Sequence, residues 1–312
     1  MTAVRIAVTG STGVLGSQVV GLLAAGGLAS SSQASSPASS PSSSAGSGLE
    51  VLALARRPDA VRAAVGPVAW DAGVVVPVRA DYGDAASLAS ALRGVDVLVF
   101  VSSDGDAARM MVHHQNVVRA AVAGGVGHVV YLSGVDADLG SPFCYAFTNG
   151  YTEGLLAASG CGFSFARASL FTEFFAAFLR PALASGVLRV PGGGGQVALV
   201  SRADVGRCLA ALALLPPSGR HHDLTGPAAL TFDDVAGVLS AVAGRPVRYT
   251  DIPAHLQVEE LARAGEDPWW TYAYSTMFAS VRQDRWAAVS DEVLQLTGRT
   301  PVSVADALRP AT

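Results

Sequence analysis

The sequence predicts an α/β protein built on a doubly wound parallel sheet, with a smaller C-terminal α/β lobe. Three observations support this class. The apolar run 4–8 leads through a glycine-rich turn at 9–16 into a helical pattern. Apolar runs then alternate with helical patterns as far as residue 168. Polar residues follow the ends of several of these runs. Alternation of strands and helices is typical of parallel sheets with right-handed crossovers.

The first turn carries glycines at 10, 13 and 16, in the sequence Thr9-Gly10-Ser11-Thr12-Gly13-Val14-Leu15-Gly16. This spacing is a variant of the dinucleotide fingerprint. One glycine permits the tight turn, one lets backbone amides approach a pyrophosphate, and one lets the helix pack on the strand. The pyrophosphate would lie at the helix N-terminus. A plain strand-to-helix turn in an Ala/Gly-rich chain is the alternative, but the position after the first strand favours a Rossmann unit that binds a cofactor.

The chain has 312 residues, half of them hydrophobic and 15% charged, which is enough apolar material for one large core and a smaller lobe. We expect a dinucleotide-binding core over 1–168 and a substrate lobe over 169–312 that shares some strands with the core. The formal net charge is −4, and the arginines are scattered. Neither a nucleic-acid nor a membrane partner is therefore expected.

The three cysteines, Cys144, Cys161 and Cys208, show no metal-ligand spacing. Adjacent histidines such as His113 and His114 diverge on a helix, so no metal site is expected. A first strand this close to Met1 and the absence of an 18-residue apolar run predict a cytoplasmic protein.

A Ser/Pro-rich tract at Ala29–Ser47 predicts a disordered insertion between the first helix and the second strand. Without it, Arg56 follows Gly16 by roughly 20 residues, the spacing of the ribose-reading residue in a Rossmann unit. Arg56 directly follows the strand Glu50–Ala55, at the position where NAD-specific units carry Asp or Glu. Because arginine can pair with a 2′-phosphate, the sequence favours NADPH. The alternative is that Arg56 and Arg57 are solvated turn residues.

Further strands are expected at 74–78, 95–101 and 127–132, with helices at 85–92 and 106–123. Asp81, Ser102 and Ser133 follow the ends of these strands, as Gly10 and Arg56 follow the first two. Ligands of open parallel sheets bind at the carboxyl ends of the strands. The shared position is stronger evidence for a site than any one of these residues.

Beyond 142 we expect a helix to 156, a strand at 162–168, a turn at the tetraglycine 192–195, helices from 201 and over 231–243, and a strand at 246–252. Two aromatic stripes have helical spacing: Phe171, Phe174, Phe175 and Phe178, then Trp270, Tyr274, Met277 and Phe278. Burial in a core is favoured for most of them, and the wall of a pocket or a lid is the alternative.

The ordered segments TGSTGVLG (9–16), ARRP (55–58), ADYGDAASLASALRGVDVLVFVSS (80–103), NVVRAAVAGGVGHVVYLSGVDAD (116–138), TEGLLAASG (152–160) and LTGPAALTFDDVAGVLSAVAGRPVRY (224–249) resemble the NmrA-like family of atypical short-chain dehydrogenases, particularly its quinone-reductase-like branch. The resemblance implies NADPH as cofactor, with Asp81 near the adenine, Ser102 and Ser103 near the ribose, and the C-terminal lobe closing over the nicotinamide. The candidate cofactor-binding residues are Gly10, Ser11, Thr12, Gly13, Val14, Leu15, Gly16, Arg56, Asp81, Tyr82, Ser102, Ser103, Ser133 and Asn149.

The candidate catalytic residues are Ser133, Tyr145 and Asn149. Relatives carry Lys or His where this chain has Asn149, so Y-x-x-x-N replaces the Y-x-x-x-K of ordinary short-chain dehydrogenases. Asparagine brings no cation to lower a tyrosine pKa. Relatives also show a polar residue where Phe174 stands.

Two functions are compatible with these residues. The favoured one is an NADPH-dependent reductase that transfers a hydride to a small-molecule substrate, a quinone or similar flat electrophile, because such an acceptor needs little acid/base help from the protein. The alternative is a redox sensor that binds NADPH without turnover and regulates a protein partner, which Asn149 favours.

Overall fold

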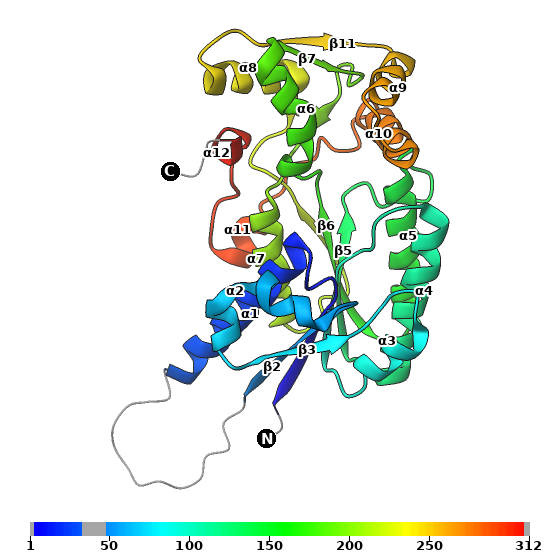
Figure 1. Cartoon of the computed structure of the whole chain (residues 1–312), viewed down its shortest axis with the longest axis vertical. Coiled ribbons are helices and arrows are strands. Elements are labelled where there is room, and N and C mark those ends of the chain that lie inside the picture. The colour runs from blue at the N-terminus through cyan, green and yellow to red at the C-terminus, as the bar shows by residue number, and fades with distance from the viewer. Residues whose placement is uncertain (1–2, 33–47, 309–312) are drawn as a thin grey trace, which may run out of the picture.

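A large sheet with helices on both faces and a smaller lobe beyond one end make up the computed structural model, which describes residues 3–32 and 48–308 (Figure 1). The elements are β1 (Val4–Val8), α1 (Val14–Ser32), β2 (Leu49–Ala55), η1 (Pro58–Ala60), α2 (Val61–Asp71), β3 (Val75–Arg79), α3 (Ala85–Ala91), β4 (Val97–Phe100), α4 (Ala107–Gly124), β5 (His128–Gly134), α5 (Cys144–Ala157), β6 (Gly162–Ala168), α6 (Thr172–Ser185), β7 (Val187–Val190), β8 (Gln196–Val197), α7 (Arg202–Ala213), β9 (His221–Leu224), β10 (Leu230–Thr231), α8 (Phe232–Ala243), β11 (Arg248–Asp251), α9 (Ala254–Arg263), α10 (Pro268–Val281), α11 (Glu292–Thr297) and α12 (Val304–Leu308).

The large sheet has seven strands in the order β3-β2-β1-β4-β5-β6-β9, and every neighbouring pair is parallel. The predicted fold class is confirmed. The strand order reverses between β1 and β4, since the chain moves outwards to β3 and then returns to the other side of β1. Crevices for ligands form at such a switch point, beyond the carboxyl ends of the strands.

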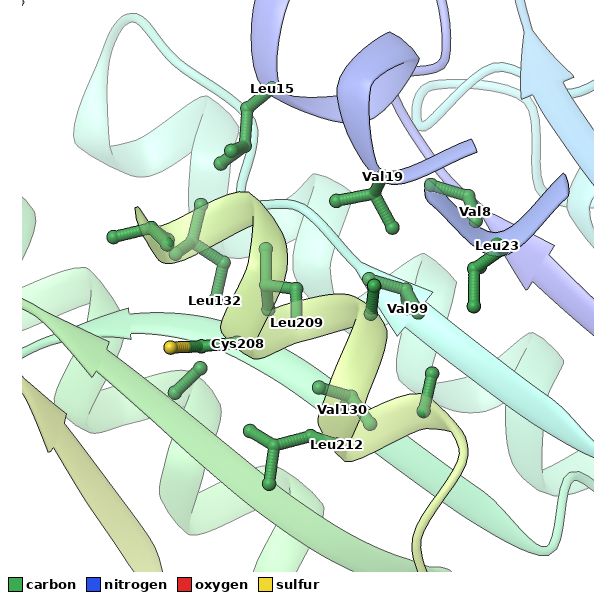
Figure 2. Packing of buried hydrophobic residues seen from close by; sticks show 14 of the residues in the cluster. Val8, Leu15, Val19, Leu23, Val99, Val130, Leu132, Cys208, Leu209 and Leu212 are labelled. Carbon is green, nitrogen blue, oxygen red and sulfur yellow. The ribbon is translucent and has the colours of Figure 1, made fainter. Parts of the chain in front are cut away.

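Helices α1, α2, α7 and α11 cover one face of the sheet, and α3, α4 and α5 cover the other (Figure 1). Figure 2 shows the first interface, where Val19 and Leu23 of α1 and Leu209 of α7 meet Val99 and Val130 of the sheet. All five side chains are almost fully buried. Burying an aliphatic side chain contributes roughly 1.5–3 kcal/mol, so this contact holds α1, and with it the glycine turn, firmly on the sheet.

The smaller lobe has a core of its own, in which Phe175 of α6, Phe232 of α8 and Phe278 of α10 lie in ring contact. Two short sheets, β11 with β7 and β10 with β8, belong to this region. After β8 the chain returns to the large sheet through α7 and β9, and it then re-enters the lobe at β10. The rim of the lobe therefore lies close to the carboxyl ends of β5 and β6.

Helix α1 extends through Ser32, so the expectation that an irregular insertion begins at Ala29 is wrong. The end of α1 reads GGLASSS at 26–32 and has little helix preference of its own, so its backbone hydrogen bonds extend from the preceding turns, because adding a residue to a helix costs less than starting one. The rest of the predicted disordered tract, 33–47, lies outside the described residues. Within 3–32 and 48–308, no helix is long and apolar enough to cross a membrane.

Candidate functional site

The turn between β1 and α1 needs its glycines for steric reasons. Gly10 has a φ of +63°, in the left-handed region that favours glycine. A Cβ at Gly16 would lie 2.2 Å from the carbonyl oxygen of Gly10, and one at Gly13 would lie 3.3 Å from the same atom. Any side chain at 16 would push the start of α1 away from the strand. Gly16 is thus the position where the start of the helix packs so closely that there is no room for a side chain, as the fingerprint predicts for its third glycine.

A cavity of about 430 Å³, here called cavity A, opens at the carboxyl ends of β1 to β4. Eight of the predicted cofactor-binding residues line it: Gly10, Thr12, Gly13, Arg56, Asp81, Tyr82, Ser102 and Ser103. Ser11, Val14 and Gly16 do not. The Ser11 hydroxyl is buried and donates to the carbonyl of Val8 at 2.7 Å, whereas the Val14 side chain is exposed. Ser11 therefore stabilises the turn, and Val14 faces solvent.

Two arginines line cavity A. Among the described residues, no hydrogen bond or ion pair engages the guanidinium of Arg56, and Arg109 of α4 lines the same wall with its side chain equally free. His113 lines the same cavity, and its buried Nδ1 has no hydrogen-bond partner among the described residues. Burial lowers the pKa of His113; the charge of Asp81 raises it, and the charges of Arg109 and Arg56 lower it. Two unpaired guanidinium groups beside a glycine turn fit the phosphates of a dinucleotide.

Asp81 and Tyr82 also line cavity A and lie beside His113, whose ring centre is 6.1 Å from that of Tyr82. The Asp81 carboxylate accepts a hydrogen bond from the amide of Gly83 at 2.9 Å. The Tyr82 hydroxyl donates to the carbonyl of Val101 at 2.6 Å, and burial raises the pKa of Tyr82. Its ring packs edge-on against Phe100. Tyr82 is therefore a fixed, neutral wall residue.

A second cavity of about 360 Å³, cavity B, adjoins the first, and residues 101–104 line both. The structure brings Ser133, Tyr145 and Asn149 together in its wall, with Leu15 of α1. Aromatic rings supply much of the remaining surface: Phe143, Phe171, Phe174, Trp270 and Trp286. Phe175, Phe178, Tyr274, Met277 and Phe278 belong to the core of the lobe instead. Each aromatic stripe is thus divided between cavity wall and core.

Ser133 belongs to strand β5 and not to a turn. Its hydroxyl donates to Glu153 at 2.6 Å, and that buried carboxylate is also held by Arg167, at 2.9 and 2.6 Å. The hydrogen of Ser133 is thereby committed to the carboxylate, so toward the cavity the oxygen can only accept.

Asn149 takes part in a chain of polar contacts across three elements. Its Oδ1 accepts from the Tyr131 hydroxyl at 2.9 Å, and the Ser102 oxygen lies 3.1 Å from that of Tyr131. Ser102 also donates to the carbonyl of Leu132 at 2.6 Å. Because the side-chain oxygen of Asn149 is occupied, its amide nitrogen is the group that this residue can offer to a ligand.

Ser103 is fixed by His114. The amide of Ser103 donates to His114 Nε2 at 3.1 Å, so the ring proton lies on Nδ1, which is 2.7 Å from Thr152 Oγ1. Burial lowers the pKa of His114 to about 3. This histidine is a neutral structural residue that holds the end of β4.

Tyr145 lies half-buried among rings, with Phe143 and Trp269 edge-on to it. Its oxygen accepts from the amide of Gly105 and from the indole nitrogen of Trp269, each at 3.2 Å. Burial raises the pKa of Tyr145 despite these two donors. The group is a neutral phenol whose own hydrogen remains for a ligand.

Several wall residues were not predicted from the sequence, chiefly Arg109, His113, Arg202 and Trp286. Arg109 and His113 are spaced i, i+4 on the helix after β4, so they share one face. That spacing could have indicated the pair. Arg202 and Trp286 come from distant segments, and the sequence carries no signal for their position. Within the described part of the chain, no group of three His, Cys, Asp or Glu side chains could hold a metal ion.

The parallel sheet in this order, with a glycine turn after its first strand and a cavity at the switch point, defines a Rossmann-type dinucleotide-binding protein. The comparison with known families agrees. The NmrA-like family matches residues 2–266, and the chain belongs to that family.

Two curated relatives are similar over most of their length. Quinone oxidoreductase 2 of Escherichia coli (strain K12) is 32% identical over 248 residues, covering 79% of this chain and 77% of that one. NAD(P)H azoreductase of Xenophilus azovorans is 29% identical over 222 residues, covering 70% and 76%. The structure of the NADPH-dependent quinone oxidoreductase of Escherichia coli in complex with NADPH superimposes with a TM-score of 0.81 at 28% identity, covering 97% of this chain and 98% of that one.

Proposed function

We propose that this protein is an NADPH-dependent oxidoreductase that transfers a hydride to a quinone or a similar flat electrophile. One observation supports the proposal most directly: cavity A, with its glycine turn and free arginines, shares the lining segment 101–104 with the aromatic cavity B. A dinucleotide lying across that segment would have its adenosine end in A and its nicotinamide at the entrance of B. Relatives named quinone oxidoreductase and azoreductase support this assignment.

Different residues would bind the cofactor and the acceptor. Arg56 would pair with the 2′-phosphate, and the amides of the turn at Gly10 and Gly13 would face the pyrophosphate. The rings of Phe174 and Trp270 would hold a flat acceptor in place, and such apolar walls exclude water from the reacting atoms.

Acid catalysis is the smaller part of the mechanism. Bound NADPH would supply the hydride, and a proton from solvent would complete the hydroquinone. Tyr145 can donate a hydrogen bond to a carbonyl oxygen of the acceptor, but its raised pKa keeps the proton on the phenol. Positioning of the two rings is therefore the main contribution of the protein.

Steady-state oxidation of NADPH with a panel of benzoquinones and naphthoquinones tests the proposal. We expect turnover that is lost in Gly13→Val, because a branched side chain there would enter the space reserved for the pyrophosphate. Val14→Ala, an exposed change in the same turn, is the matched control and should keep full activity.

The alternative function is a sensor that binds NADPH without turnover and regulates a protein partner. Asn149 favours it, because no cation stands beside Tyr145 at the position where ordinary short-chain dehydrogenases carry lysine. Tight NADPH binding without oxidation by any quinone of the panel would select this alternative. We place the protein in the cytoplasm in either case, on the basis of its three unpaired cysteines.

A further inference from the structure

Among the described residues, one cationic side chain lines cavity B, and no part of the proposed hydride transfer uses it. Arg202 begins α7 and lines the wall together with Ser169 and Phe171 at the end of β6. Its guanidinium lies 5.5 Å from the centre of the Phe171 ring. A half-buried arginine normally pairs with a carboxylate or with backbone carbonyls, because leaving the charge without partners is costly.

The described residues offer this guanidinium no such partner. Both oxygens of the Glu173 carboxylate accept from the backbone amide of Arg202 at 3.1 Å, and neither pairs with its side chain. Asp204, two residues further on, binds Ser201 and Arg207 instead. Asp104 lines the cavity too but forms no ion pair with Arg202.

Ser169 supplies a second, independent observation. The residue is 3% exposed and lines cavity B, and its hydroxyl oxygen is buried without a hydrogen-bond partner among residues 3–32 and 48–308. Native proteins leave few buried hydroxyls unsatisfied, since each costs free energy. An unpaired donor and an unpaired cation in one wall point to a ligand group that accepts hydrogen bonds and carries negative charge.

We propose that Arg202 and Ser169 form a subsite for an anionic substituent, such as a carboxylate or sulfonate, on the flat acceptor that cavity B holds. The planar guanidinium suits the two oxygens of such a group, and its cation–π contact with Phe171 helps to hold it in place. This inference rests on the proposed function, and it narrows the substrate class to aromatic acceptors with an acidic group. Arg202 is a specificity-determining residue in this account and takes no part in hydride transfer.

Equilibrium binding of two unreactive probes to the protein saturated with NADP⁺ tests the subsite. Naphthalene-2-sulfonate and naphthalene-2-sulfonamide have nearly the same shape but differ in charge. By isothermal titration calorimetry, the wild type should prefer the sulfonate by about 10- to 100-fold, the range expected of a charge-assisted contact. In Arg202→Gln the preference should fall below about threefold, whereas Arg202→Lys should retain part of it.

Two further variants separate the subsite from general effects. Arg119→Gln removes an exposed arginine of α4 and should leave the preference unchanged. Ser169→Ala should weaken sulfonate binding while the melting temperature stays the same or rises, because the hydroxyl it removes has no partner within the protein. A melting temperature that falls with binding would assign Ser169 a structural role and overturn its place in the subsite.

An unchanged sulfonate preference in Arg202→Gln would overturn the proposal. So would a loss of NADP⁺ affinity in that variant without a change in the sulfonate preference, since Arg202 would then serve the cofactor's phosphates. Failure of the proposed function looks different: the probes would still be distinguished through Arg202, but no quinone would be reduced. If quinones are reduced with the same kcat/KM whether or not they carry an acidic group, the proposed hydride transfer is supported and this subsite is contradicted.

Discussion

Arg56 shows how far the chemistry of a single residue can be predicted. A free guanidinium at the end of β2, in the wall of cavity A, is what the pattern of a strand followed by arginine predicts for NADPH recognition. The neighbouring Arg57 does not line the cavity. Arg109 and His113 were not predicted, because their place beside Arg56 depends on how α4 crosses the end of the sheet.

We expect Arg56→Ala to weaken NADPH binding by about 10- to 100-fold, since a charge-assisted contact contributes roughly 1.5–3 kcal/mol. NADH, which has no 2′-phosphate, should bind wild type and variant alike. Fluorescence titration of both cofactors checks this, with Arg57→Ala as the matched control. Equal NADPH affinities of wild type and Arg56→Ala would transfer the role to Arg109.

Tyr145 should be dispensable as an acid. With a quinone acceptor, Tyr145→Phe should lower kcat/KM by less than about 100-fold, because a phenol whose pKa is raised by burial is a poor proton donor at neutral pH. The pH profile of kcat/KM should show no tyrosine ionisation between pH 6 and 9. A thousandfold loss with NADPH binding intact would restore the ordinary short-chain dehydrogenase mechanism.

The elements of the fold were predicted more completely than the site. Strands and helices followed from apolar runs and turn residues, and those expected differ from the observed ones mostly by a few residues at their ends. Helix α2 was not expected, since its segment 61–71 contains Gly66 and Pro67. Strand β5 runs through Ser133 because its residues pair with β6 up to Gly134, which no local pattern marks. Helix α1 runs past Ala29 for a similar reason, since helical hydrogen bonds can continue into a polar tract. The division of each aromatic stripe between core and cavity also needed the structure.

Replacement of 33–47 by a shorter Gly/Ser linker should leave the melting temperature and the NADPH dissociation constant nearly unchanged. The tract is rich in serine and proline, and the entropy of loop closure varies slowly with length. The replacement begins after Ser32 so that α1 stays whole. A loss of several kcal/mol in the free energy of unfolding by urea would show that the tract packs against the domain.

At the scale of the whole molecule, neutral buried histidines make stability depend on pH. Burial lowers the pKa of His114 to about 3 and that of His128 to about 4, whereas an unfolded histidine has a pKa near 6.5. Below pH 6.5 the unfolded chain therefore binds more protons than the folded one. Stability from these groups is full above pH 6.5 and falls as the pH drops toward 4, by up to about 1.4 kcal/mol per pH unit for each histidine.

His128→Gln should flatten this dependence. Between pH 6 and 5, the free energy of urea unfolding should fall less steeply in the variant than in wild type, by about 1 kcal/mol per pH unit. His221→Gln is the control, since His221 is exposed and should leave the slope as it is. Identical slopes for wild type and His128→Gln would mean that this histidine is protonated in the folded state.

The central claim is that cavities A and B act as one site in which NADPH reduces an acceptor. A single turnover tests it most directly: the protein saturated with NADPH is mixed with excess 1,4-naphthoquinone, and absorbance at 340 nm is followed. We predict loss of one equivalent of NADPH per occupied site, slowed when the transferred hydrogen at C4 of the nicotinamide is deuterium. NADPH that stays bound and unoxidised, with wild-type affinity and Arg56 dependence, would contradict the account.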